Sequence, residues 1–188
     1  MAIKTSGELN AMLRAMQTNE QREEFLNGTK YLYFAYGSNM SISQMAIRCP
    51  KAKPMFKATL HGAKMLFRTY ADVMRFRKNT KSFVRGVVFE ITEDCMTALD
   101  RYEGYPRMYK KVKCVVQGPY DKYYEAFMYV MQKDVRELKL PSEKYLDTIL
   151  QGYFDWKIPT TSLCKAWEET ALQLGEIKSF NSKESNND

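Results

Sequence analysis

Apolar and polar positions along the chain predict a set of strands separated by turns. Residues 82–91 form a nearly continuous apolar run rich in β-branched residues, and residues 31–36 are mostly aromatic or aliphatic, types that suit a pleated, half-buried surface. Residues 109–116 and 123–131 are also predicted to be strands. Residues 55–70 predict two more strands that meet at a turn near Gly62. The polar residues 77–81 form a predicted turn before the next strand.

Helices are predicted from capping residues and from the spacing of apolar positions. They cover residues 41–47, 92–103, 141–151 and 162–174. Ser41 and Thr92 are residue types suited to an N-cap, and Gly104 suits the left-handed position after a helix end. Strands and helices do not alternate strictly, so the order predicts an α+β fold with a curved, mostly antiparallel or mixed sheet.

The main domain is predicted to span residues 30–175, with a segment on either side. Residues 1–29 are interpreted as a helical extension, since apolar residues within residues 9–16 recur at the spacing of one helix face. Residues 176–188 are polar and are predicted to be a flexible tail. The extension carries no recognisable chemistry, and one hypothesis is that it contacts a regulatory partner.

Composition narrows the class of protein. The 188 residues suit one domain with extensions, and no apolar run approaches the ~20 residues that a membrane-spanning helix needs. The first residues lack the apolar core of a secretory signal. The four cysteines are scattered and form no metal-binding pair. We therefore expect a cytoplasmic protein with reduced thiols, no membrane association and no metal.

The net charge of +7 is distributed unevenly. Residues 48–85 hold eleven Lys and Arg residues against one acid, Asp72. This basic segment, residues 48–85, could attract nucleic acid, an acidic partner or an acidic substrate, or it could be an ordinary solvated face. Composition does not reveal the oligomeric state.

Common catalytic motifs are missing from the sequence. His61 is the one histidine, so a Ser-His-Asp or Cys-His site would depend on it alone. It lies in a basic strand with no nucleophile motif nearby, which favours a packing or surface role. The chain also lacks the glycine loops of nucleotide-binding proteins and the HExxH metal motif. These absences leave two features that could carry chemistry.

The first feature is the turn Gly37-Ser38-Asn39, between a strand and a helix start. This arrangement can direct backbone N–H groups at a bound anion, although it is also a common connection. The second is Glu103, at a predicted helix end beside Tyr102 and Tyr105. Aromatic enclosure would raise the pKa of a carboxyl and suit it to proton transfer, whereas an exposed helix-end glutamate would do nothing.

Several motifs, taken together, resemble the γ-glutamylcyclotransferase-like family. They are Phe34-Ala35-Tyr36-Gly37-Ser38-Asn39-Met40, Arg48-Cys49-Pro50, Gly86-Val87-Val88-Phe89, Leu99-Asp100-Arg101-Tyr102-Glu103-Gly104-Tyr105-Pro106 with Tyr109, Tyr129-Val130-Met131, and Pro141-Ser142-Glu143-Lys144-Tyr145. The resemblance covers about residues 31–160. It implies a small mixed, barrel-like sheet flanked by helices, with a pocket at the mouth of the barrel.

The resemblance also implies roles for particular residues. Substrate-binding residues would be Tyr36, Gly37, Ser38, Asn39, Tyr109 and Tyr145. The turn would hold the glutamyl α-carboxylate, and Glu103 would be the catalytic acid and base. The implied reaction cyclises a γ-glutamyl amide or amine conjugate to 5-oxoproline, releases an amine and needs no cofactor.

The basic segment departs from the family pattern. Residues 69–85 are strongly basic where the family suggests a more neutral, glycine-containing loop beside the pocket. An acidic leaving group is one interpretation. The alternative is a binding module of the same fold, weakly catalytic or silent, whose basic surface binds nucleic acid or an acidic partner.

Overall fold

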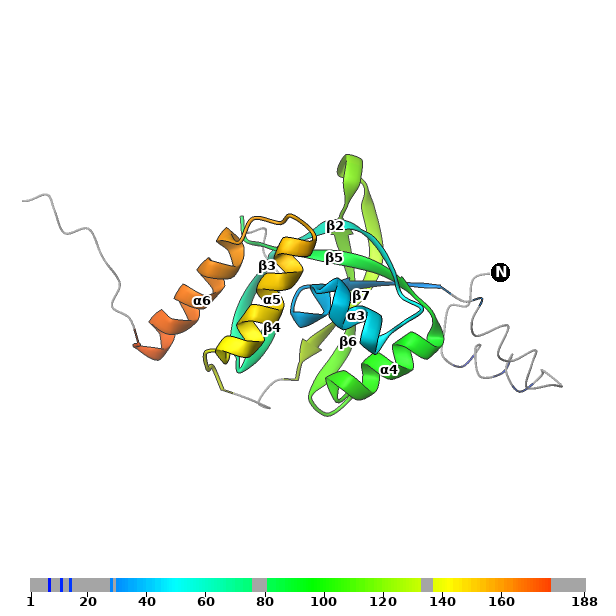
Figure 1. Cartoon of the computed structure of the whole chain (residues 1–188), viewed down its shortest axis with the longest axis horizontal. Coiled ribbons are helices and arrows are strands. Elements are labelled where there is room, and N and C mark those ends of the chain that lie inside the picture. The colour runs from blue at the N-terminus through cyan, green and yellow to red at the C-terminus, as the bar shows by residue number, and fades with distance from the viewer. Residues whose placement is uncertain are drawn as a thin grey trace, which may run out of the picture.

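Five strands close into a barrel in the structure, a computed structural model that describes residues 30–75, 81–132 and 137–176 with Gly7, Ala11, Arg14 and Gly28. The barrel strands are β1 (Tyr31–Ala35), β2 (Lys53–His61), β5 (Phe83–Ile91), β6 (Tyr109–Gln117) and β7 (Tyr123–Met131). Their order around the barrel is β1-β5-β2-β6-β7 (Figure 1). Neighbours are antiparallel except β1 and β7, which run parallel through the pair Tyr33–Phe127.

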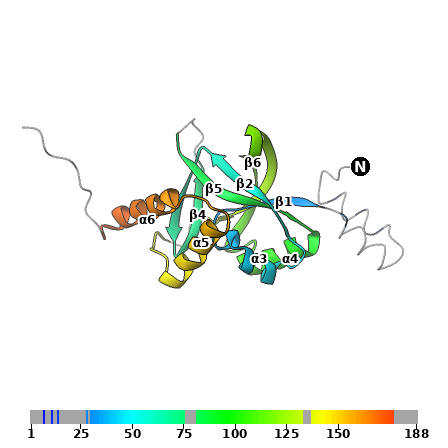
Figure 2. The same cartoon turned by 45° about the horizontal axis from the view of Figure 1, so that its top comes forward.

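A separate hairpin and four helices surround the barrel. The hairpin is β3 (Ala63–Arg68) with β4 (Tyr70–Arg75). The helices are α3 (Ile42–Arg48), α4 (Glu93–Glu103), α5 (Glu143–Asp155) and α6 (Thr161–Leu174), and the short 3-10 turns are η1 (Ser38–Met40) and η2 (Pro119–Asp121). Figures 1 and 2 show α5 and α6 on the side of the hairpin, and α3 and α4 together on the other side. The predicted α+β fold with a mixed, barrel-like sheet is confirmed.

Buried apolar side chains from all five barrel strands fill the core. One example from each strand is at most 1% exposed: Phe34, Leu60, Val88, Val116 and Met128. Strand β5 is buried along most of its length, which explains its nearly continuous apolar sequence, whereas β2 and β6 also carry exposed positions.

The predicted helix boundaries follow from local hydrogen bonds. Ser41 Oγ accepts from the N–H of Gln44, and Thr92 Oγ1 accepts from that of Cys95, so both act as N-caps. Gly104 ends α4 with a φ of 64°. These short-range signals need no tertiary information, which is why the sequence was sufficient to place them.

Two elements differ from the sequence prediction. Residues 70–75 form β4, whereas the sequence predicted no strand between residue 70 and the turn at 77–81. Asp72 interrupts the apolar pattern of this strand, although it is buried there. Its Oδ1 accepts hydrogen bonds from the N–H groups of Val73 and Met131, and its Oδ2 pairs with Arg68. Helix α5 continues to Asp155 rather than ending near residue 151.

The chain ends lie mostly outside the described residues. The predicted helical extension, residues 1–29, is described at four isolated positions only, and residues 177–188 of the predicted tail are not described. Both assignments stay predictions. In the described part of the chain, no helix is long and apolar enough to cross a membrane.

Gly152 lies where α5 packs against the η1 turn. A Cβ at this position would lie 2.6 Å from Met40 Cβ and 2.8 Å from the backbone nitrogen of Ser41. The glycine therefore lets the helix backbone contact the η1 turn directly. At the end of α5, Trp156 Nε1 donates to the carbonyl oxygen of Met40 at 2.9 Å, which fixes the turn from the same side.

Replacing Gly152 with alanine should destabilise the protein. Alanine improves helix propensity by about 1 kcal/mol, but the overlap with the turn backbone should outweigh this gain and cost about 1–3 kcal/mol net. Urea unfolding would measure the change, with Gln151→Ala on the exposed face of α5 as the control. A Gly152→Ala variant as stable as wild type would contradict the close contact.

Candidate active site

The Gly37-Ser38-Asn39 turn lies between β1 and α3 and overlaps η1. Its backbone N–H groups point to no hydrogen-bond acceptor among the described residues. Their neighbours Met40 and Ser41 instead donate back to the turn. A run of unsatisfied N–H groups is suited to an anion such as a carboxylate. The turn thus has the donors that the sequence analysis predicted for it.

Gly37 allows other elements to approach the turn. A Cβ there would lie 3.3 Å from both Ala71 Cβ and the Tyr145 hydroxyl oxygen. A larger residue would push β4 and α5 away from the turn. The same close approach places the Tyr145 hydroxyl beside the unsatisfied donors.

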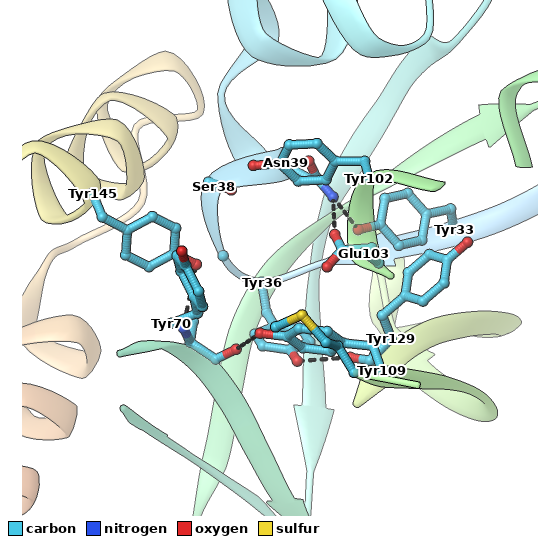
Figure 3. Close-up of a pocket in the computed structure, with 13 residues that line it drawn as sticks. Tyr33, Tyr36, Ser38, Asn39, Tyr70, Tyr102, Glu103, Tyr109, Tyr129 and Tyr145 are labelled. Atoms are coloured by element: carbon cyan, nitrogen blue, oxygen red, sulfur yellow. Dashed lines mark hydrogen bonds between the residues drawn. The ribbon is translucent and has the colours of Figure 1, made fainter. Parts of the chain in front are cut away.

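Glu103 faces this turn from the last residue of α4. Asn39 Nδ2 donates to Glu103 Oε1 at 2.8 Å and to the Tyr33 hydroxyl oxygen at 2.8 Å (Figure 3). In the described part of the chain, no hydrogen bond reaches the second oxygen, Oε2. One oxygen of Glu103 therefore fixes the carboxyl, while the other is available to a ligand.

Burial raises the pKa of Glu103 to about 7. Loss of hydration disfavours the carboxylate, while the hydrogen bond from Asn39 and the charge of Arg48 act in the opposite direction but are smaller. A carboxyl with this pKa exists in both forms near neutral pH. It can therefore accept a proton and return it without a large free-energy cost.

Arg48 orients the amide that holds Glu103. Its guanidinium donates to Asn39 Oδ1 and to Ser38 Oγ, and it stacks on the Tyr102 ring at 3.7 Å from the centroid. Because Asn39 Oδ1 accepts from Arg48, Asn39 Nδ2 must face Glu103. Arg48 therefore positions the site without lining the cavity. In the sequence, Arg48 belongs to a motif typical of the family, but no role for it was predicted.

The tyrosines around the cavity fall into two groups by hydrogen bonding. The Tyr36 hydroxyl donates to the carbonyl oxygen of Tyr129 at 2.6 Å, and the Tyr109 hydroxyl donates to that of Ala71 at 3.1 Å. Neither hydroxyl therefore has a proton left to donate to a ligand. Tyr145 instead accepts from the N–H of Ala71 at 3.2 Å, and Tyr33 accepts from Asn39. Tyr145 and Tyr33 can therefore each donate a hydroxyl proton to a ligand.

A cavity of about 260 Å³ separates the turn from the tyrosines. All seven site residues that the sequence suggested line it: Tyr36, Gly37, Ser38, Asn39, Glu103, Tyr109 and Tyr145. Six more residues line it that the sequence analysis did not assign to the site: Tyr33, Tyr70, Ala71, Tyr102, Met108 and Tyr129. Tyr102 and Tyr129 belong to motifs quoted for the family resemblance, and this was the signal that could have found them. Tyr70 gave none, because β4 was not recognised.

The described Lys and Arg residues of the basic segment do not line this cavity, although its Tyr70 and Ala71 do. Among the described lining residues, Glu103 is the one charged side chain, and none of the basic residues of 48–85 lines the wall. His61 is exposed on β2, bonded to Gln117 and away from the cavity. The described residues contain no cluster of His, Cys, Asp and Glu that could hold a metal, and none of the four cysteines forms a disulfide.

Comparison with known families agrees with this geometry. Residues 33–153 match the family model described as gamma-glutamyl cyclotransferase, AIG2-like. The chain belongs to this family. The match spans both the η1 turn and Glu103, the two sides of the cavity. No curated protein sequence matches the chain.

Solved structures of the same fold have low sequence identity. One described as "Gamma-glutamyl cyclotransferase" has a TM-score of 0.64 and 22% identity, over 85% of this chain and 94% of its own. An uncharacterized protein from Homo sapiens has a TM-score of 0.61 and 24% identity, over 83% and 94%. A yeast gamma glutamyl cyclotransferase described as specific to glutathione has a TM-score of 0.54 and 11% identity, over 82% and 100%. At these identities the likeness shows the fold.

Glu103→Gln should stabilise the protein at neutral and alkaline pH. The pKa of Glu103 is raised from 4.5 to about 7, so the stability that the protonated carboxyl provides is lost as pH rises through about 7. Glutamine stays neutral and avoids this loss. At about 1.4 kcal/mol per pKa unit, the variant should gain up to about 3 kcal/mol above pH 7 and nothing below pH 4.5.

Thermal unfolding across the pH range would measure this difference. Glu168→Gln, which removes an exposed carboxyl from α6, should show no comparable trend. A Glu103→Gln effect of the same size at pH 4 and pH 8 would refute the raised pKa.

Arg48→Met should raise the pKa of Glu103 further above 7. The variant removes a positive charge that favours the carboxylate, and it frees the Asn39 amide to turn away. A carbon-13 NMR titration of the Glu103 carboxyl would measure the shift. Arg101→Met removes an equal charge from the exposed face of α4 and should leave the titration unchanged. An unchanged pKa in Arg48→Met would argue against the positioning role.

Proposed function

We propose that the protein is a γ-glutamylcyclotransferase that converts a γ-glutamyl amide or amine conjugate into 5-oxoproline and a free amine. The observation that carries the proposal is the pairing, across one cavity, of a carboxyl whose pKa is about 7 with a turn of unsatisfied N–H groups. The first suits proton transfer and the second suits a carboxylate. Membership of the family supports the same reaction.

The substrate would bind with its α-carboxylate on the N–H groups of Gly37, Ser38 and Asn39. Its α-ammonium would then lie toward Glu103, and its γ-carbonyl would fold back toward the same side. Holding this folded conformation would supply much of the acceleration, because the attacking nitrogen and the carbonyl carbon belong to one molecule.

Glu103 would act first as a base. Its carboxylate takes a proton from the α-ammonium, since an ammonium has no lone pair with which to attack. The free amine then attacks the γ-carbon, and a new C–N bond closes the five-membered ring.

Glu103 would then act as an acid. It returns its proton to the leaving nitrogen, and the original amide C–N bond breaks. After the attack, the ring nitrogen carries two protons and loses one of them to become the lactam N–H. This proton also ends on the released amine, which leaves as an ammonium ion. No electrons are transferred, and all atoms of the substrate appear in the two products.

Tyr145 would stabilise the negative charge that develops on the γ-carbonyl oxygen. Its hydroxyl accepts from Ala71 and so keeps a proton to donate, unlike the hydroxyls of Tyr36 and Tyr109. The hydroxyl also lies close to the turn, within the same wall of the cavity. A donor fixed before the charge develops is the arrangement that lowers the barrier.

The residues that line the cavity indicate which kind of leaving amine it can accept. Beyond the turn and Glu103, the described lining consists of tyrosines, Ala71 and Met108, with no Lys or Arg to pair with a carboxylate. A leaving group that carries its own carboxylates would lose hydration here without gaining an ion pair. The walls therefore favour a γ-glutamyl amine over glutathione, and they do not support the acidic leaving group considered from the basic segment.

Product formation gives the direct test. We expect mass spectrometry to detect 5-oxoproline when the protein is incubated with γ-glutamyl amines, and less product from γ-glutamyl amino acids and glutathione. Glu103→Gln should lower kcat/KM by about 10²-fold or more, because a general acid–base residue contributes on this scale. The variant should still bind substrate, as measured by calorimetry. Absence of 5-oxoproline from every compound would refute the proposal.

A further inference from the structure

A second cavity lies away from Glu103, between β3, the start of β5 and α6. Its volume is about 280 Å³. Its lining shares no residue with the first cavity, and helix α5 contributes to both, with Tyr145 in one and Tyr153 in the other. The catalytic proposal gives this cavity no role.

Basic side chains line this second cavity. Among the described lining residues are Lys64, Lys81, Arg85 and Lys165, against one acid, Glu169. Lys64 pairs with Glu169 at 2.5 Å, so three cations remain for a ligand. Three of the four come from the basic segment, residues 48–85, none of whose described Lys and Arg residues lines the first cavity.

Arg85 is half-buried in this cluster and also lines a neighbouring cavity. Its guanidinium lies 5.5 Å from the centroid of the Phe83 ring. No described acidic residue forms an ion pair with it. Its charge acts on the Tyr153 hydroxyl, where it opposes the rise in pKa that burial causes. A half-buried guanidinium without a carboxylate partner is suited to bind an anion.

Hydroxyl groups stand beside the guanidinium. Tyr153 OH and Ser162 Oγ lie 3.3 Å apart, and Ser82 and Thr161 also line the cavity. The rest of the wall is apolar and includes Met65, Val84 and Ala166. The cavity thus combines several cations and hydroxyls with an apolar surface.

We propose that this cavity binds a small organic phosphate, with the phosphoryl group on Arg85 and the organic part against the apolar wall. Three available cations match a dianionic phosphate better than a single carboxylate. The cavity volume is close to the lower end of the range for small-molecule sites. A nucleic-acid backbone would need a groove that continues along the surface, so we favour the small molecule.

Binding of phenyl phosphate would test the site. Calorimetry at moderate salt should show binding of phenyl phosphate that is tighter than that of inorganic phosphate, because only the ester has an apolar part. Arg85→Met should weaken binding about tenfold or more, as expected for loss of a charge-assisted contact. Lys57→Met removes an equal charge from an exposed position of the same basic segment and should have little effect.

Two further variants test whether a loss of binding comes from misfolding, and whether binding depends on the first cavity. Lys165→Met, on the exposed side of α6, should also weaken binding and covers the case in which Arg85→Met does not fold. Glu103→Gln should bind phenyl phosphate as wild type does, so this result is independent of the cyclotransferase proposal. Absence of binding, or equal losses in Arg85→Met and Lys57→Met, would overturn the inference.

A single-stranded oligonucleotide provides the remaining comparison. If the oligonucleotide binds tightly, is released by salt and is insensitive to Arg85→Met, while phenyl phosphate does not bind, the basic segment serves nucleic acid instead. That outcome would also overturn the proposal. Competition between phenyl phosphate and the oligonucleotide that is lost in Arg85→Met would support it.

Discussion

The side-chain amide of Asn39 joins the elements on which the site depends. Its nitrogen donates to Tyr33 on β1 and to Glu103 on α4, and its oxygen accepts from Arg48 on α3. Tyr33 and Arg48 are close to Asn39 in sequence, whereas Glu103 is 64 residues away, and one planar group fixes the relative positions of all three. The amide can satisfy all three contacts in one orientation only, since its donor and acceptor cannot exchange roles. The barrel supports the turn that carries it, and α5 supports the turn from the other side.

Charge is divided between two cavities that the fold keeps apart. The first contains one carboxyl among tyrosines, so its chemistry depends on whether that carboxyl holds a proton. The second collects cations supplied by β3, β5 and α6. If the cations lined the first cavity instead, they would lower the pKa of Glu103 and remove its ability to exchange a proton near neutral pH.

The sequence predicted those features that depend on neighbouring residues. The strands, the N-caps Ser41 and Thr92, and the glycine after α4 all follow from local preferences. The seven suggested site residues were found through motifs, and the structure brings them to one cavity, although their roles stay predictions. Strand β4 was missed because Asp72 finds its partners in β7 and at the end of β3. The orientation of Asn39 was likewise not predictable, since it depends on contacts across the fold.

Glu103 is the last residue of α4, and this position has an electrostatic consequence. The aligned peptide dipoles of a helix leave partial negative charge at the C-terminal end, where basic side chains are favoured and acidic ones are not. Gly104 ends the helix directly after Glu103, so the carboxyl stays at this negative pole. An acidic residue there gains nothing from the helix dipole and, because it is partly buried, also loses hydration. Glu103 therefore makes α4 less stable, and the proposed role in proton transfer would account for a carboxyl at this position.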